Sequence, residues 1–392
     1  MTTSIIITVC VLVLLSYFFD LSSKKTKIPA VVLLLLLGWI VRLLTAFFNI
    51  KIPDLHILLP IFGTIGLILI ILEGSLELEL NKSKKKILLK TVFSGLIQLT
   101  LLVFILGYGF HLLSGEPLIS SFVNAIPLSI ISSAIVIPSA KHLSSNTKEF
   151  VIYESSLSDI FGVIAFNFFA TDEILNLGTF TDFSLQLILM LIISLGACLG
   201  LAYLLKLIAH HVKFIPILLI VVLIYSISEI YHLPALIFVL LFGLFLNNID
   251  DLRHFRFVRK MDPDNFNKEI HRFREMISEF TFLIRSLFFL LFGFLIDINE
   301  LMNIESIILA LLITGIIFII RYVYFKITKA DTLELIFLAP RGLITILLFL
   351  TIPSSMQIPY VNESLMILVI IFTSLSMMFG LMFKKDTNLP IS

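Results

Sequence analysis

The sequence predicts an all-α integral membrane protein of about thirteen transmembrane helices, arranged as two repeats of opposite orientation. Three observations indicate this fold: the composition, the alternation of positive charge between successive connections, and a repeated pattern in the apolar segments. Of the 392 residues, 59% are hydrophobic and only 14% are charged, and the mean hydropathy is +1.09. Soluble domains contain about 25% charged residues. This composition therefore indicates a chain that lies in lipid.

Apolar runs of roughly 17–25 residues, long enough to cross the hydrocarbon core, are the expected elements of this fold. The candidates lie at about 4–20, 28–49, 56–74, 87–113, 117–140, 150–171, 183–208, 213–230, 233–247, 279–297, 304–327, 332–352 and 361–383. The first run lacks the basic segment and the small-residue cleavage site of a signal peptide, so we expect a helix there. We expect one transmembrane domain over residues 1–392 with no soluble domain, and a cytoplasmic amphipathic connection at 248–278.

The positions of the basic residues support this number of helices independently. Most of the 28 Lys and Arg residues fall in the odd-numbered connections or near the C-terminus, whereas the even-numbered connections contain only Lys51. Cytoplasmic loops of membrane proteins are enriched in Lys and Arg. The N-terminus is therefore predicted outside the cell and the C-terminus in the cytoplasm. A wrong number of helices would have destroyed this alternation.

Two pairs of similar segments predict an inverted repeat. "KIPAVVLLLLLGWIV" and "HLPALIFVLLFGLFL" both place a glycine nine residues after the proline of a Pro-Ala pair, and "LILIILEGSLELE" resembles "LFFLLFGFLIDIN". The paired helices are seven apart, an odd number, so the halves at about 25–175 and 230–385 should face opposite sides of the membrane. Such repeats are common in secondary transporters, whose substrate sites lie near the midplane on discontinuous helices. Chance similarity between apolar segments is the alternative.

The same offset pairs two runs that contain helix-breaking residues. The run at 117–140 contains Pro127 and Pro138, and the run at 332–352 contains Pro-Arg-Gly at 340–342. Proline removes a backbone donor, and lipid does not tolerate the freed backbone groups unless they line a cavity or bind a ligand. We therefore expect two crossing discontinuous helices, with two simple kinks as the alternative.

Two carboxylates lie inside the predicted span at 150–171. Glu154 and Asp159 are five residues apart, which separates them by about 140° around a helix, so they should have different partners. Arg321 is the expected partner of Glu154, because arginine stays protonated at any accessible pH; the pair would be structural. Asp159 has no obvious counter-charge, so it can bind either a proton or a cation, with the Ser155 hydroxyl one turn away.

The other candidate site residues supply oxygen atoms or charge near Asp159. The expected cation ligands are the hydroxyls of Ser155 and Ser158 and the backbone carbonyls near Ser132 and Ser133. Glu73 is a further acidic candidate, and an ordinary surface carboxylate at a helix end is the alternative. Arg341 is expected to neutralise the ends of the half-helices at the second break.

Several other classes of function are not supported by the sequence. A net charge of +1 without a basic face gives no indication of nucleic-acid binding. Cys10 and Cys198 form neither a disulfide framework nor a metal-binding spacing. No cofactor and no metal site are expected. The predicted spans contain no Ser/His, paired-Asp or His-metal arrangement, so an intramembrane enzyme is not expected either.

The motif "ESSLSD" at 154–159 resembles the Glu-Ser-x-x-Asn-Asp signature of the cation:proton antiporter superfamily, in its sodium/proton exchanger family. "PRG" at 340–342, "FFLLFG" at 288–293 and "LEGSLELEL" at 72–80 also resemble motifs of that family, and the resemblance extends over nearly the whole chain. It implies an antiporter fold, a homodimer, and an ion held by Asp159, Ser155 and the unwound helix that contains Ser132 and Ser133. It also implies the Glu154–Arg321 pair and, in some relatives, a role for Glu73.

Two departures from the family pattern bear on the transported ion. Ser158 stands where electroneutral exchangers have Asn and electrogenic ones have a second Asp. With a single site carboxylate, we expect electroneutral exchange of one monovalent cation, Na+ or else Li+ or K+, for one proton across a bacterial cytoplasmic membrane, with a role in pH homeostasis. "ISSAIVIPS" replaces the familiar Thr-Asp-Pro and is closer to the potassium-efflux branch. A potassium/proton antiporter is therefore one alternative, and a channel-like or transport-inactive sensor is another.

Overall fold

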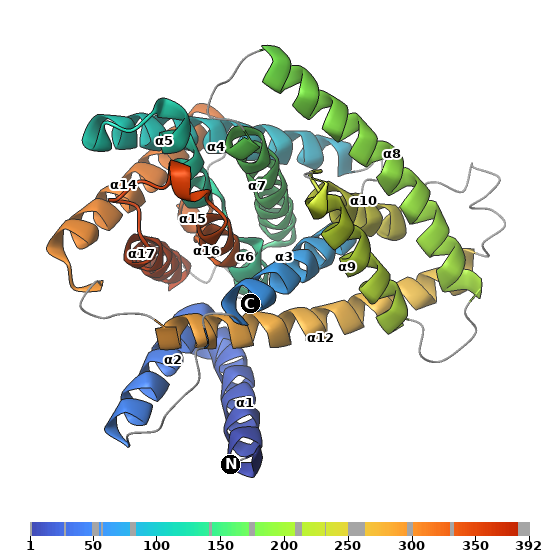
Figure 1. Ribbon diagram of the computed structural model, residues 1–392, viewed down its shortest axis with the longest axis horizontal. Helices are drawn as coiled ribbons and strands as arrows, with labels where there is room; N and C mark the ends of the chain where they lie inside the picture. The colour runs from blue at the N-terminus through green and yellow to red at the C-terminus, as the bar shows by residue number, and fades with distance from the viewer. Residues whose placement is uncertain are drawn as a thin grey trace, which may run out of the picture.

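The computed structural model is all-helical, without strands, in the residues that it describes: 2–26, 29–48, 55, 58–78, 84–140, 143–171, 177–207, 214–231, 233–249, 263–295, 301–329 and 333–382. Its α-helices are α1 (Thr2–Thr26), α2 (Ala30–Phe47), α3 (Leu58–Glu77), α4 (Lys85–Ser114), α5 (Leu118–Ser129), α6 (Ser133–Ser139), α7 (Ser145–Thr171), α8 (Leu177–Leu207), α9 (Phe214–Ile230), α10 (Leu236–Asn247), α12 (Pro263–Leu295), α14 (Ile304–Ile327), α15 (Leu333–Phe337), α16 (Leu343–Leu350) and α17 (Glu363–Met382), and one 3-10 turn, η3, spans Ser354–Met356. Figure 1 shows their arrangement, with α6, α7 and α16 near the middle.

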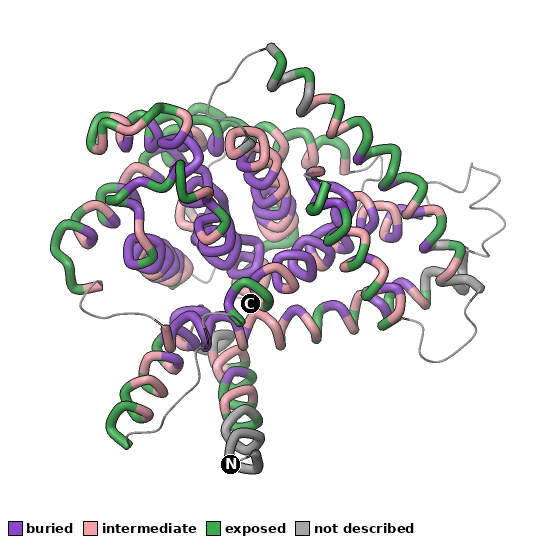
Figure 2. The backbone as a smooth tube through the Cα atoms, in the orientation of Figure 1, coloured by how far each residue is buried: buried purple, intermediate pink, exposed green. Residues whose placement is uncertain are grey.

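Each predicted run contains a helix, and the two runs with breakers each contain a pair, so the predicted all-helical membrane fold is confirmed. Eight helical segments of the described chain are long and apolar enough to cross a membrane, and α9 and α10 are shorter apolar helices. Large apolar side chains are exposed on peripheral helices such as α8 and α14, whereas the central helices are mostly buried (Figure 2). An apolar periphery around a buried centre is the pattern expected of a bundle surrounded by lipid.

The predicted connection at 248–278 differs from the structure in its second part. Residues 250–262 lie outside the described chain, and from Pro263 onward the polypeptide already forms α12, which continues through the predicted span to Leu295. Ile270, Phe273 and Ile277 recur at helical spacing and are buried. These apolar residues anchor the amphipathic stretch as the first half of one long helix.

Repeat-related helices make equivalent close crossings. α2 packs on α12 and α10 packs on α3. A Cβ atom at Gly38 would lie 2.2 Å from the carbonyl oxygen of Leu290 on α12, and one at Gly243 would lie 1.8 Å from the hydroxyl of Ser75 on α3. The glycine that the repeated Pro-Ala segments share therefore allows the same close approach in both halves. We call α2, α3, α10 and α12 the scaffold.

The two broken helices meet at their breaks. α5 ends at Ser129 and α6 begins at Ser133, with extended backbone at Ile130 and Ser132. The Ser132 amide donates to the Pro340 carbonyl between α15 and α16, at 2.9 Å. A Cβ atom at Gly342 would lie 2.4 Å from the Ser132 hydroxyl, so only glycine fits where the segments cross. Backbone groups freed by one break are thus satisfied by the other.

Candidate ion-binding site

Asp159 lies on α7 beside the break between α5 and α6, and it is 3% exposed. Its Oδ2 accepts hydrogen bonds from the hydroxyl and from the backbone amide of Ser133, the latter at 3.3 Å. Its Oδ1 is buried and has no hydrogen-bond partner among the described residues. The carboxylate therefore has one oxygen bound and one oxygen available.

Ser132 provides a second unpartnered oxygen at the crossing. Its hydroxyl is buried, lies against Gly342 and has no partner within the described part of the chain. Buried hydroxyls and carboxylate oxygens are normally hydrogen-bonded, so two unpartnered oxygens at one break require an explanation. Oxygen ligands of this kind suit a hard monovalent cation or a proton.

Ser158 and Ser155 bond to backbone groups rather than to Asp159. The Ser158 hydroxyl oxygen accepts from the Ile131 amide at 3.0 Å, an amide that the end of α5 leaves without a helical partner. The Ser155 hydroxyl donates to the Ile152 carbonyl of its own helix at 3.2 Å, which leaves its oxygen free to accept or ligate. Ser158 thus holds the unwound segment of the first break against α7.

Glu154 and Arg321 form the ion pair expected from the sequence, fully buried between α7 and α14. The Nη2 of Arg321 donates to Oε2 of Glu154 at 2.8 Å and Nη1 donates to Oε1 at 3.3 Å. The same guanidinium donates to the carbonyls of Leu335 at 2.8 Å and of Leu338 at 3.1 Å, at the end of α15. Arg321 therefore fixes the start of the second break to the helix that contains Asp159.

Two residues of this network, Ser94 and Gln98 on α4, were missed in the sequence. Ser94 donates to Oε1 of Glu154 at 2.5 Å, and Gln98 donates to the same oxygen at 3.0 Å while its own carbonyl oxygen accepts from Arg321 at 3.0 Å. Both side chains are buried. Their spacing of four residues in an otherwise apolar run places them on one helix face, and that signal was available in the sequence.

Arg341 is fully buried and binds backbone carbonyls. It donates to Leu128 at 2.6 Å and to Ser129 at 3.3 Å, at the C-terminal end of α5, and to Ala339 at 2.9 Å. The last carbonyls of a helix have no helical partner and carry partial negative charge. The guanidinium donates to these carbonyls at the break, and neutralising the ends of the half-helices stays a predicted role for it.

Glu73 does not contact Asp159 through any hydrogen bond among the described residues; it lines a cavity of about 340 Å³ that reaches Ser133. This inner cavity is lined by Tyr17, Asp20, Ile70, Glu73, Gly74, Glu77, Ser133, Ala134, Ile137, Pro138, Ser278, Glu279, Phe282 and Arg285. Glu73 thus lies on the last turns of α3, in the wall of a cavity that also includes Ser133, the hydrogen-bond partner of Asp159.

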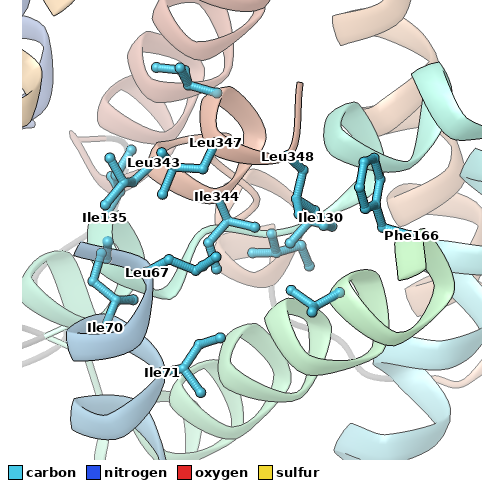
Figure 3. Close-up of a cluster of buried hydrophobic side chains, with 14 of the residues drawn as sticks. Leu67, Ile70, Ile71, Ile130, Ile135, Phe166, Leu343, Ile344, Leu347 and Leu348 are labelled. Carbon is cyan, nitrogen blue, oxygen red and sulfur yellow. The ribbon is translucent and has the colours of Figure 1, made fainter. Parts of the chain in front are cut away.

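A second cavity, of about 690 Å³, opens at the opposite end of α3, where Pro60 and Gly63 line it. We call it the outer cavity. Side chains of Leu67, Phe166, Leu347 and Leu348 line its floor, and Figure 3 shows them in one apolar cluster with Ile130 and Ile344. Ser133 lines the inner cavity and does not line the outer one.

Crossing discontinuous helices in an inverted repeat, with a buried carboxylate at the break, define a secondary transporter of small ions. The family model described as "Sodium/hydrogen exchanger, transmembrane" matches residues 9–385. The chain belongs to this family of cation/proton antiporters, which confirms the resemblance of the motifs. The family is one of transporters and not of enzymes.

Solved structures support the fold. The chain is similar to a structure of the sodium proton antiporter MjNhaP1 from Methanocaldococcus jannaschii at pH 8, with a TM-score of 0.72, 18% identity, and coverage of 97% of this chain and 98% of that one. A second structure of the same antiporter, from electron microscopy, gives a TM-score of 0.64 at 18% identity, covering 97% and 95% of the two chains. A comparison with curated proteins finds no match.

Proposed function

We propose that this antiporter exchanges one Na+ for one proton and that Asp159 binds the two ions alternately. The observation that carries the proposal is the unpartnered Oδ1 of Asp159 beside the unpartnered hydroxyl of Ser132, at a break that the inner cavity reaches and the outer cavity does not. A bound cation would take these two oxygens, and the oxygen of Ser155 or nearby backbone carbonyls would complete its shell. A bound proton would occupy the same carboxylate.

The balance of charge at the site supports a one-for-one exchange. Glu154 is neutralised by Arg321, so Asp159 is the single carboxylate without a counter-charge at the crossing in the described chain. Na+ and a proton each neutralise Asp159, and Arg341, buried at the same crossing, carries the same charge in both loaded forms. Exchanging one ion for the other therefore transfers no net charge, in contrast to a site with two free carboxylates.

The architecture supports a cycle in which the broken helices move against the scaffold. A cation enters from the inner cavity and binds Oδ1 of Asp159 and the hydroxyl of Ser132, beside Ser133, which binds Oδ2. While the broken helices move, Arg321 keeps the second break attached to α7, and Arg341 keeps the two breaks attached to each other. The apolar cluster of Figure 3 then closes one path before the other opens.

We further propose that the protein lies in a bacterial cytoplasmic membrane with its C-terminus inside and takes part in pH homeostasis. The distribution of Lys and Arg supports this orientation, and it places the inner cavity on the cytoplasmic side. The expected homodimer and the repeat halves at 25–175 and 230–385 belong to the same proposal, which the family membership and the equivalent helix crossings support.

Dissipation of a pH gradient in everted vesicles tests the function. Na+, Li+ and K+ are added separately to vesicles that contain the parent protein, Asp159→Asn or the control Glu305→Gln, an exposed carboxylate on α14. We expect Na+ to dissipate the gradient with the parent and the control but not with Asp159→Asn. Equal activity of Asp159→Asn would refute the role of this residue.

K+ is the second candidate cation, because the first break contains Ser132 and Ser133 where the family pattern has Thr-Asp-Pro, as in the potassium-efflux branch. Dissipation by K+ but not by Na+ would identify a potassium/proton antiporter. Electrical currents on solid-supported membranes would contradict the one-for-one exchange. Steady ion flow without any cation-dependent proton movement would indicate a channel.

A further inference from the structure

Pro138 leaves one carbonyl of α6 without its helical donor. In an α-helix the amide of residue 138 would donate to the carbonyl of Ala134, but proline has no N–H. Nη1 of Arg285, on the scaffold helix α12, donates to that carbonyl at 3.0 Å. A charged side chain of the scaffold thus replaces the missing backbone donor of a broken helix.

This contact lies next to the ion site in sequence and in space. Ala134 follows Ser133, whose hydroxyl and amide bind Oδ2 of Asp159. Ser133, Ala134 and Arg285 line the same inner cavity. A cation that binds Oδ1 of Asp159 and the hydroxyl of Ser132 lies beside the first turn of α6, so its binding moves that turn and the Ala134 carbonyl with it. The hydrogen bond from Arg285 therefore responds to the occupancy of the site.

Arg285 also has other acceptors within its cavity. Its Nη2 lies 3.9 Å from Oδ1 of Asp20 on α1, and its side chain is 14% exposed. Glu73 and Glu77 on α3 and Glu279 on its own helix line the cavity as well; Glu77 is paired with Arg274 at 3.2 Å. A buried cation that loses one partner is strongly destabilising unless another is present. Here the nearby carboxylates compensate Arg285 after it releases α6.

We propose that Arg285 is a positioning residue that holds α6 against the scaffold while the site is open to the inner cavity. It must release the Ala134 carbonyl before the broken helices can move relative to the scaffold. The proposal rests on the exchange cycle proposed above. In this proposal, the hydrogen bond from Arg285 to the Ala134 carbonyl, which Pro138 leaves without a helical donor, connects the moving broken helices to the scaffold.

Cysteine labelling from the two sides of the membrane tests this role without measuring transport. In a Cys10→Ser/Cys198→Ser background, Ile137→Cys reports the inner cavity and Thr351→Cys reports the outer cavity, since these residues line them. The probe is a membrane-impermeant maleimide applied to right-side-out or everted vesicles. Arg285→Gln should reduce labelling at position 137 and increase it at position 351, each by about threefold or more.

Pro138→Ala provides the matched control. It restores the helical N–H that competes with Arg285 for the Ala134 carbonyl, so it should shift labelling in the same direction. Combined with Arg285→Gln, it should cause little further change in labelling, because both substitutions remove the same Arg285–Ala134 hydrogen bond. Arg285→Lys keeps a cationic donor, so its labelling at both positions should stay closer to that of the parent. If Arg285→Gln does not fold, Arg285→Lys and Pro138→Ala are compared instead.

Unchanged labelling in Arg285→Gln, or fully additive shifts in the double variant, would overturn the proposal. A shift in labelling together with vesicles in which no cation dissipates the pH gradient would instead support the fastening role and refute the proposed function. The two failures are therefore distinguishable.

Discussion

Replacing Arg321 with glutamine is the sharpest test of the buried charge network. The guanidinium binds Glu154 and Gln98 and donates to the carbonyls of Leu335 and Leu338. Removing one partner of a buried ion pair costs about 3–5 kcal/mol, and each carbonyl left without a donor adds about 1–3 kcal/mol. We expect a loss of at least about 5 kcal/mol from the free energy of unfolding, against a total of about 5–15 kcal/mol for a typical protein.

Glu154→Gln should be milder, since Arg321 keeps both carbonyls and the side-chain oxygen of Gln98. We expect a loss of about 3 kcal/mol, the lower end for a broken buried pair. The double variant Glu154→Gln/Arg321→Gln should be more stable than Arg321→Gln alone, because it leaves no charge buried without a partner.

Thermal unfolding of the purified protein in detergent measures these differences. At about 2–4 °C of Tm per kcal/mol, Arg321→Gln should lower Tm by about 10 °C or more and Glu154→Gln by about 6 °C or more. Lys326→Gln, an exposed cation on the same helix, should change the stability by less than about 0.5 kcal/mol. Equal losses in the two single variants, or a double variant less stable than Arg321→Gln, would refute the reasoning.

Three further outcomes follow from the site. Ser158→Ala leaves the Ile131 amide without an acceptor, so it should cost about 1–3 kcal/mol and slow exchange, whereas Ser158→Asn retains an acceptor and most of the activity. Gly342→Ala should abolish exchange in vesicles while the protein still reaches the membrane, because the added carbon meets the Ser132 hydroxyl. If protons and Na+ compete for Asp159, the apparent KM for Na+ should rise as the pH falls, by up to about tenfold per unit where the proton dominates; a KM independent of pH would contradict the competition.

The helices and their breaks could be predicted because their signals are local. Apolar length identifies spans, and proline and glycine indicate interrupted helices: the second break falls at Pro-Arg-Gly 340–342, and the first falls between Pro127 and Pro138, which themselves lie inside α5 and α6. The pairing of Glu154 with Arg321 could be predicted because charged side chains inside a membrane normally need a partner of opposite charge. The position of Asp159 between the two breaks followed from the family motif rather than from geometry.

The roles of Ser158, Ser94 and Gln98 depend on contacts between segments that are distant in the sequence, and those contacts cannot be predicted from local sequence patterns. Ser158 can accept a hydrogen bond from the Ile131 amide only because that amide lies close to α7. This proximity depends on how the two breaks cross. Ser94 and Gln98 share a helix face, but nothing local indicates that this face meets Glu154. The start of α12 was missed because its charged residues outweigh its buried apolar positions in a hydropathy profile; these are Asp264, Lys268, Glu269, Arg272, Arg274 and Glu275.

The apolar cluster between the two cavities also determines where the membrane voltage acts. If water fills the two cavities, it brings the electrical potential of each side to the cavity walls, and most of the voltage falls across the apolar layer that contains Leu67, Ile130 and Phe166 (Figure 3). Moving one unpaired charge through that layer would involve about 2.3 kcal/mol per 100 mV. In the proposed one-for-one exchange, Asp159 would cross this layer only when neutralised, so transport would be driven by the two concentration gradients and would not depend on voltage.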